Sequence, residues 1–405
     1  MPPMVGRSQR VLSGMRPSGR LHLGHLHGSL KTWIELQNTF ACFFFVADLH
    51  ALATDYERPG KIGADSLDMV VDWLAAGVLP DSATLFVQSK VPEHAELAVL
   101  LGMIAPLGWL ERVPSFKEQQ ERLRDRDVST YGFLGYPVLQ SADILLYRAA
   151  LVAVGDDQLA NVELTREMAR RFNHLYGSEP DFAARAEAAV PKLGARNAQL
   201  YRELRRSYQE QGDLEALDKA RALLKDQQSM THGDLDRLFG YLEGSSRVIL
   251  QEPQALRAES RRIPGLDGHT MSNAAGNAIT LRDTAAEVEA KIRTMPTDPA
   301  RVRRADPGDP RRCPVWALHQ VYSDAETRDW VQQGCTSAGI GCLECKQPII
   351  EAVDAEIGPI RVRAEELAKD PTQVRVVLNE GTDAARDVAR DTMEHVRRVM
   401  GLSYR

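Results

Sequence analysis

A chain of 405 residues is too long to fold around one ordinary hydrophobic core, so we predict two or three domains. Its composition, 43% hydrophobic and 26% charged, is ordinary for a soluble globular protein, and no apolar run approaches the roughly 18 residues that span a bilayer. We therefore expect a cytoplasmic protein without a membrane segment. The net charge of −6 shows that the chain as a whole is not basic, as many nucleic-acid-binding proteins are, but it allows a local basic stripe that binds RNA.

The N-terminal half alternates strand-like apolar runs with helix-length amphipathic segments. This alternation predicts a doubly wound α/β domain with a parallel sheet over residues 1–192. Ligands of such sheets bind at the carboxyl ends of the strands, where loops lead into helices. The expected strands are 10–15, 41–50 and 83–89, and the expected helices are 29–38, 63–77, 93–105 and 159–177.

The rest of the chain changes character twice. Residues 193–262 are highly charged, lack strand-like runs and carry Leu and Ala at helical spacing, which predicts an inserted helical subdomain. This insert is interpreted either as a surface elaboration or as a contact for RNA or a partner. Residues 263–282 return briefly to the α/β pattern, and residues 283–405 are expected to form a second, helical domain.

The segment PSGRLHLGHLHG, residues 17–28, lies where the first predicted strand meets a helix. Helix N-termini leave N–H groups unpaired and carry positive partial charge, so they attract phosphate. His22 and His25 project from one side of the first turn, and Gly24 lets a flat ring or a phosphate approach the backbone. The pattern favours an adenine nucleotide whose α-phosphate is attacked. The alternative is a glycine-rich connection with incidental histidines.

Four of the five cysteines are clustered in the C-terminal third of the chain. In a reducing compartment such a cluster is more often a metal site than a set of disulfides. Four thiolates suit zinc or a [4Fe–4S] cluster, although a zinc ribbon usually shows two short pairs and this chain has one. Zinc, an iron–sulfur cluster and free thiols therefore remain open at this point. The four residues are Cys313, Cys335, Cys342 and Cys345.

The remaining cysteine and a run of arginines have simpler interpretations. Cys42 lies inside an apolar run and is expected to be an inert core residue. The segment RVRRADPGDPRR is either a phosphate-contacting patch or a solvated loop. Its five arginines are Arg301, Arg303, Arg304, Arg311 and Arg312.

The His-Leu-Gly-His spacing after SGMRPSG resembles the first signature of class I aminoacyl-tRNA synthetases. Among these the chain is most similar to the tryptophanyl enzymes, through VADLHAL, LERVPSFKE, GFLGYPVLQSADILLY, VGDDQLANVELTREM and GCTSAGIGCLECK. Only the insert, near 194–262, has no counterpart in their common short form. The cysteine spacing resembles the iron–sulfur-containing bacterial subset, which implies a [4Fe–4S] cluster, with zinc less expected, that stabilises the helical domain facing the anticodon.

The resemblance also implies a reaction and a set of roles. The carboxylate of L-tryptophan attacks the α-phosphate of ATP, with Mg²⁺, and the adenylate is passed to tRNA(Trp) by a homodimeric enzyme. The implied catalytic residues are His22, His25, Lys117 and Ser272, and the implied ATP-binding residues are Arg16, Gly24, Gly155, Asp157 and Met271. The implied tryptophan-binding residues are Gly14, His50, Tyr136, Gln140, Asp143 and Gln158. The four clustered cysteines are the implied metal ligands.

The segment YPVLQSADILLY carries the preference for tryptophan. Tyr136, Gln140 and Asp143 are spaced by four and three residues, so they share one helix face. A buried carboxylate at Asp143 accepts the indole N–H, which is a donor only. A substrate without that donor leaves the buried carboxylate without a hydrogen bond, which costs about 1–3 kcal/mol of binding free energy. The alternative for Asp143 is a helix N-cap or a solvated charge.

The second class I signature, commonly Lys-Met-Ser-Lys-Ser, departs from its pattern here. Residues 270–274 read TMSNA, so both lysines are absent. Loss of one preorganised donor costs roughly 10²–10³ in kcat. Three interpretations follow: His269, Arg261 or Arg262 supplies the charge, the enzyme is slower but competent, or the chain is an impaired paralogue that senses tryptophan or its adenylate. We favour a competent enzyme. Small nucleotidyltransferases share the histidine signature but are far shorter.

Overall fold

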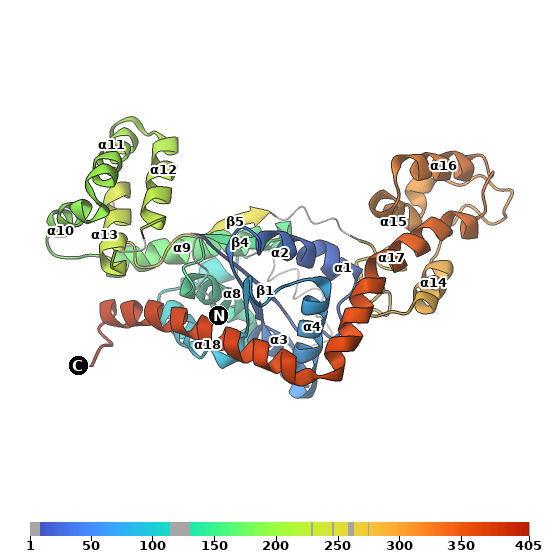
Figure 1. Ribbon diagram of the computed structural model, residues 1–405, viewed down its shortest axis with the longest axis horizontal. Helices are drawn as coiled ribbons and strands as arrows, with labels where there is room; N and C mark the ends of the chain where they lie inside the picture. Colours follow the sequence, from blue (N-terminus) through green and yellow to red (C-terminus); the bar gives the residue numbers. More distant parts are fainter. Residues whose placement is uncertain are drawn as a thin grey trace.

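The computed structural model describes residues 9–113, 130–227, 230–244, 247–257, 263–273 and 275–404 (Figure 1). A five-stranded parallel sheet of order β3-β2-β1-β4-β5 forms its centre. The expected doubly wound α/β class is thereby confirmed. The strands are β1 (Arg10–Met15), β2 (Ala41–Val46), β3 (Ala83–Val87), β4 (Leu151–Val154) and β5 (Gln254–Arg257).

The middle strands are covered on both faces. Every residue of β2 is buried, as expected for a parallel strand that carries an uninterrupted apolar run. Phe43 and Phe45 pack into the core on one face, whereas Cys42 and Phe44 pack into the core on the other. Trp33 stacks on Phe44 with ring centroids 4.3 Å apart. Cys42 is therefore a core residue, as predicted.

Helices surround the sheet and end where the sequence signals an end. The helix α4 stops at Gly77, whose φ of 118° is the left-handed conformation that favours glycine. No helix in the described part of the chain is both long and apolar enough to cross a bilayer. The helices are α1 (Leu23–His25), a π-helical turn (Leu26–Leu30), α2 (Lys31–Leu36), α3 (Asp48–Asp55), α4 (Ile62–Ala76), α5 (Glu93–Gly102), α6 (Leu107–Leu110), α8 (Tyr131–Leu146) and α9 (Leu159–Tyr176), with short 3₁₀ turns at Pro59–Lys61, Gln88–Lys90 and Asp156–Gln158.

A helical subdomain stands at one end of the molecule, between α9 and β5 (Figure 1). It has its own buried core, in which the Tyr201 hydroxyl donates to the Leu238 carbonyl at 2.6 Å. The sequence placed this insert at 193–262, but its helices begin at Phe182, and β5 pairs with β4 in the sheet. Its elements are α10 (Phe182–Ala189), a 3₁₀ turn (Val190–Leu193), α11 (Ala195–Gln211), α12 (Leu214–Lys225) and α13 (His232–Glu243).

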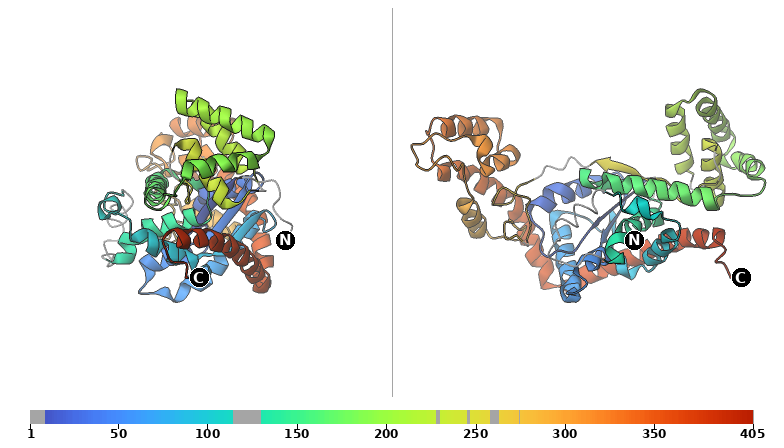
Figure 2. Two further views of the ribbon diagram at one scale, coloured as in Figure 1. Left: turned by 90° about the vertical axis from the view of Figure 1, so that its left-hand side faces the viewer. Right: turned by 180° about the vertical axis from the view of Figure 1, so that it is seen from behind.

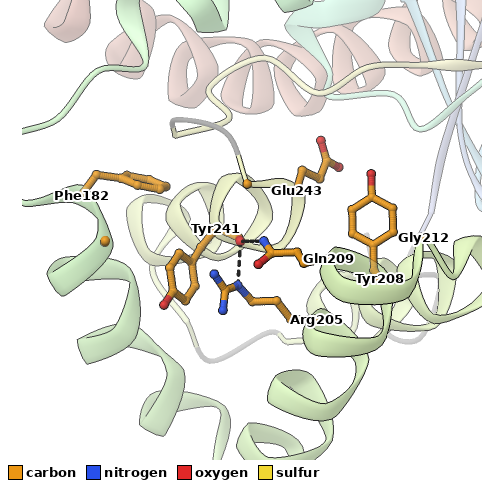
Figure 3. A pocket seen from close by; sticks show the side chains of 9 residues that line it. Phe182, Arg205, Tyr208, Gln209, Gly212, Tyr241 and Glu243 are labelled. Carbon is orange, nitrogen blue, oxygen red and sulfur yellow. Dashed lines mark hydrogen bonds between the residues drawn. The ribbon is translucent and has the colours of Figure 1, made fainter.

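An open concavity in this subdomain lies at the carboxyl end of α13 (Figure 3). The Arg205 guanidinium carbon lies 3.6 Å from the centre of the Tyr241 ring, and its Nε donates to the Tyr241 carbonyl at 2.8 Å. Gln209 Nε2 donates to the same carbonyl at 3.0 Å and to that of Leu242 at 3.1 Å. These side chains satisfy carbonyls that a helix end leaves unpaired, so capping accounts for the arrangement.

The C-terminal helices divide between two places. The helices α14 to α16 and the first part of α17 extend from the end of the molecule opposite the insert (Figure 2). In contrast, α18 packs along β3, where a Cβ on Gly381 would collide with the Leu85 carbonyl. The last helix thus covers the sheet and is not confined to the helical domain expected over 283–405. The elements are α14 (Ala285–Thr294), a 3₁₀ turn (Pro310–Arg312), α15 (Pro314–Tyr322), α16 (Ala325–Thr336), α17 (Cys342–Lys369) and α18 (Pro371–Val399).

Candidate active site

A cavity of about 550 Å³ opens at the carboxyl ends of β1 and β4. Parallel α/β sheets bind their ligands at this edge, where strands lead into helices. Its walls come from the ends of these strands, from α3 and α8, and from the turn after β4. The predicted site residues that line it are Gly14, Arg16, His25, His50, Tyr136, Gln140, Asp143, Gly155, Asp157 and Gln158.

The first signature forms the start of α1. The rings of His22 and His25 lie side by side, with centroids 3.8 Å apart, and the backbone N–H of His22 donates to His25 Nδ1 at 3.3 Å. A Cβ on Gly24 would lie 2.9 Å from His22 Cε1, so only glycine fits beneath that ring. His22 Nδ1 is buried without a partner among the described residues. The two imidazoles therefore meet on one side of the turn.

Burial keeps both imidazoles neutral. It lowers the pKa of His22 to about 4, and burial with the neighbouring His22 lowers the pKa of His25 to about 3. A neutral imidazole donates from one nitrogen, so each ring can offer one N–H to a phosphate. Phosphate binding at these rings does not require them to be charged beforehand.

The free energy of unfolding is expected to fall as the pH falls from about 6.5 towards 4, because histidines in the unfolded chain titrate near 6.5 and bind protons that the folded chain rejects. Each such histidine contributes a slope of at most about 1.4 kcal/mol per pH unit. His25→Gln removes one of them and should flatten the slope accordingly. Urea unfolding across this pH range measures it, and an unchanged slope would contradict the neutral burial of His25.

Asp143 lies on α8 with only 1% of its surface exposed. Its Oδ2 lies 2.7 Å from His50 Nε2, while its Oδ1 accepts from Gln88 Nε2 at 2.7 Å and lies 2.6 Å from His94 Nδ1. Burial alone would raise the pKa of Asp143, but the contacts with His50 and His94 outweigh it and lower the pKa to about 2. A carboxylate has about four acceptor positions. Three are used by these neighbours, which leaves one for a donor in the cavity.

Two of these neighbours were missed from the sequence. Gln88 and His94 are completely buried, and His94 also places its Nε2 2.7 Å from the Tyr147 hydroxyl. Both lie in QSKVPEH, directly after the apolar run of β3. Polar residues immediately after a buried strand at the ligand edge were the available signal.

An amide cluster forms another part of the wall. Asn161 Nδ2 donates to Gln140 Oε1 at 2.9 Å and to Gln158 Oε1 at 2.8 Å, and Gln158 Nε2 donates to Asp157 at 2.9 Å. Tyr136 stands edge-on to the His50 ring, with centroids 6.5 Å apart. The sequence did not identify Asn161. This side of the cavity offers oriented donors and acceptors to a polar ligand.

The second signature lies beside the first and does not form part of the cavity wall. Met271 is buried, and its Cβ would lie 3.7 Å from a Cβ on Gly24. The Ser272 N–H donates to Asn277 Oδ1 at 2.7 Å. Asn273 Nδ2 donates to the Arg20 carbonyl at 2.6 Å. Lys117, Arg261 and Arg262, to which the sequence assigned catalytic or compensating roles, lie outside the described residues.

The four clustered cysteines line a second, small cavity together with Asp298 and Arg301. None of the four forms a disulfide. Burial, followed by the neighbouring cysteines, raises the pKa of Cys345 to about 12, and His319 Nε2 lies 3.3 Å from its Sγ. Among the residues that the structure describes, no three His, Cys, Asp or Glu side chains are arranged to hold a metal ion as they stand.

The arginine run divides into one structural and four exposed members. Arg301 is buried, and its Nη2 donates to the carbonyls of Arg304 at 2.9 Å and Ile340 at 2.6 Å. Arg301 therefore fits neither the phosphate-contacting patch nor the solvated loop, because its guanidinium holds two chain segments together. Arg303, Arg304, Arg311 and Arg312 remain exposed.

Comparison of the chain with known proteins shows similarity to one family of enzymes. The family model for class I tRNA synthetases (W and Y) matches residues 4–193 and 226–357, which leaves α11, α12, the end of α17 and α18 unmatched. The tryptophan–tRNA ligase of Ralstonia nicotianae is 60% identical over 396 residues, covering 98% of this chain and 99% of that protein. The ligase of Thermotoga maritima is 41% identical, covering 98% and 100%. The crystal structure of tryptophanyl-tRNA synthetase from Campylobacter jejuni with ADP and tryptophan is similar at a TM-score of 0.71 and 25% identity, covering 97% and 100%.

Proposed function

Because the chain belongs to the class I tRNA synthetases of the tryptophan and tyrosine family, we propose that it joins L-tryptophan to tRNA(Trp). The tryptophan carboxylate attacks the α-phosphate of ATP and releases pyrophosphate. The tryptophanyl-adenylate then esterifies the terminal ribose of the tRNA and releases AMP. The observation that carries the choice of amino acid is the buried carboxylate of Asp143, which lines the cavity and has one acceptor position beyond the three that His50, Gln88 and His94 use.

In the activation step His22 and His25 donate to the phosphates as negative charge is redistributed, which is the electrostatic stabilisation usually worth most. ATP enters as its Mg²⁺ complex. Arg16 lines the cavity and supplies a fixed positive charge to the triphosphate. The triphosphate is further held by Lys117 and Ser272. Gly24 and Met271 flank the adenine, and Gly155 and Asp157 hold the ribose.

In the tryptophan subsite the indole N–H donates to Asp143. The amino and carboxylate groups lie against Tyr136, Gln140 and Gln158, whose amides Asn161 orients. His50 fixes the second oxygen of Asp143. Gly14 leaves room for the Phe45 ring, since a Cβ at Gly14 would lie 2.4 Å from that ring, and so shapes the floor of the cavity.

The function is tested by tryptophan-dependent exchange of pyrophosphate into ATP, followed by charging of tRNA(Trp). We expect exchange that saturates with tryptophan and not with tyrosine, and charging of the tRNA. Exchange without charging, or tryptophan binding without exchange, would identify the chain as the impaired paralogue that senses tryptophan or its adenylate.

We also propose that Cys313, Cys335, Cys342 and Cys345 hold a [4Fe–4S] cluster, which staples the helical segments around it and takes no part in the reaction. A single zinc requires all four sulfurs about 2.3 Å from one point, whereas a cluster distributes four irons among them. The four cysteines that line one small cavity support the proposal.

Anaerobic purification should yield about four irons per chain and a broad visible absorption, both lost in Cys345→Ser. Cys42→Ser is the matched control, since Cys42 lies in the sheet core away from this cavity, and it should keep the iron. One zinc per chain without visible absorption, or no metal under anaerobic conditions, would contradict the cluster.

For partners we propose a homodimer in the cytoplasm and a tRNA contact through the helical domain. Large apolar side chains on α5, α6 and the start of α8 support the dimer, because Val99, Met103, Leu107 and Tyr131 are all exposed. The exposed arginines of 303–312 support the RNA contact.

A further inference from the structure

The loss of both lysines from the second signature leaves Asn273 at the place of the second one. Asn273 is exposed, yet its side-chain amide binds the protein itself. Its Nδ2 donates to the Arg20 carbonyl at 2.6 Å and, more weakly, to the Ser18 carbonyl at 3.4 Å. Both acceptors belong to the turn that precedes the histidine pair. A neutral side chain therefore joins the two signatures directly.

The acceptor turn is shaped for this contact. Gly19 lies between the two accepting carbonyls with a φ of 89°, the left-handed conformation that favours glycine. A Cβ on Gly19 would lie 3.8 Å from Asn273 Nδ2. The amide nitrogen thus sits closely over the turn.

The rest of the second signature is internally braced. Asn277 accepts from the Ser272 N–H at 2.7 Å, and its Nδ2 donates to Asp267 at 2.8 Å and to the Thr270 carbonyl at 3.1 Å. The segment that follows the second signature also contacts the first, because the Leu23 N–H donates to the Ile279 carbonyl at 3.1 Å. The bonds of Asn273 add a direct contact between this braced segment and the turn at residues 18–20.

We propose that Asn273 is a positioning residue, a latch that holds the second signature closed over the first before any nucleotide binds. A lysine at this place closes a loop by binding phosphate and so depends on the ligand. The amide of Asn273 uses a backbone acceptor that is always present. The loop that carries Met271 and Ser272 is then ordered in advance, which lowers the entropy cost of ATP binding. The catalytic consequence rests on the proposed function, whereas the latch itself does not.

The latch is tested by hydrogen exchange of the nucleotide-free protein, followed by mass spectrometry of peptides over 266–276. Asn273→Asp keeps the shape of the side chain but replaces the donor with an acceptor that faces two carbonyls. We expect exchange in this segment to be about tenfold faster than in the wild type, with unchanged melting temperature. Asn38→Asp is the matched control, since Asn38 is also exposed and donates to a backbone carbonyl, that of Ile34 at 3.0 Å. It should leave the segment unchanged.

Kinetics give a second readout. In tryptophan-dependent pyrophosphate exchange, Asn273→Asp should lower kcat about tenfold or more and leave the KM for tryptophan within about twofold, because the Asp143 pocket is untouched. Asn273→Ala, which only loses the donor, should fall between Asn273→Asp and wild type. A wild-type segment that exchanges like an unstructured loop, or an Asn273→Asp protein equal to wild type in both assays, would overturn the latch. If the wild type shows no exchange of pyrophosphate, the proposed function fails, and the hydrogen-exchange result still decides on the latch.

Discussion

Replacing Asp143 with alanine is expected to weaken tryptophan binding by roughly 10- to 150-fold, which corresponds to about 1.5–3 kcal/mol for a hydrogen bond to a charged acceptor. The substitution removes the acceptor for the indole N–H. It also leaves three buried donors, on His50, Gln88 and His94, without their shared partner. ATP binding should stay within a few-fold of the wild type, because the proposed phosphate-binding residues are His22, His25 and Arg16 and not Asp143.

Titration calorimetry with each ligand separately measures the effect. Asp213→Ala is a matched control, because Asp213 caps the helix α12 in the insert and its carboxylate accepts from the Ala216 N–H at 3.1 Å. That change should cost about 1 kcal/mol of stability and leave both ligands bound. If Asp143→Ala lost tryptophan and ATP together, Asp143 would support the whole site and would not select the indole.

Replacing His25 with alanine is expected to lower kcat for tryptophan-dependent pyrophosphate exchange by about 10²–10³-fold, the usual cost of removing one preorganised donor to a developing charge. The third histidine of the same motif provides the control. His27 places its Nε2 2.9 Å from Glu356 and 3.1 Å from the Tyr322 hydroxyl, which ties α17 and α15 to the first helix. His27→Gln should therefore lower stability and leave kcat within a few-fold.

Steady-state exchange at saturating ATP and tryptophan separates the two histidines. Equal losses in His25→Ala and His27→Gln would indicate that the motif acts through packing alone. A loss confined to the KM for ATP would indicate that His25 binds ground state and transition state equally.

The strands that the sequence predicted are those whose residues are mostly apolar. The segments at 10–15, 41–46 and 83–87 become β1, β2 and β3, in which most residues are buried. The strand β3 lies at an edge of the sheet, but α18 packs along it. The strands β4 and β5 were not predicted. They are four residues each, and β5 reads QALR, so its pairing with β4 depends on the edge position and not on its own composition.

The insert and the last helix show that the spacing of apolar residues predicts a helix but not where that helix packs. A charged helical pattern predicts an amphipathic helix but does not reveal which core its apolar face covers. For that reason α10 was assigned to the catalytic part, although it packs on α13 in the insert. Likewise α18 was assigned to the helical domain, although it covers the sheet.

Some residues of the candidate site could be predicted from the sequence and others could not. Residues within recognisable motifs, such as Tyr136, Gln140 and Asp143, come together in one cavity. Gln88 and His94 were not assigned to the site from the sequence. Gln88 reaches Asp143 from the turn after β3, and His94 reaches it because α5 packs on α8. Arg301 shows the converse, because a run of arginines in sequence does not indicate which of them turns inward.

A crystal structure of the protein with tryptophan and a non-hydrolysable ATP analogue tests the central claim most directly. We predict the indole nitrogen about 2.7–3.2 Å from a carboxylate oxygen of Asp143, and the α-phosphate beside the imidazoles of His22 and His25. An indole bound elsewhere, or phosphates remote from both rings, would contradict it.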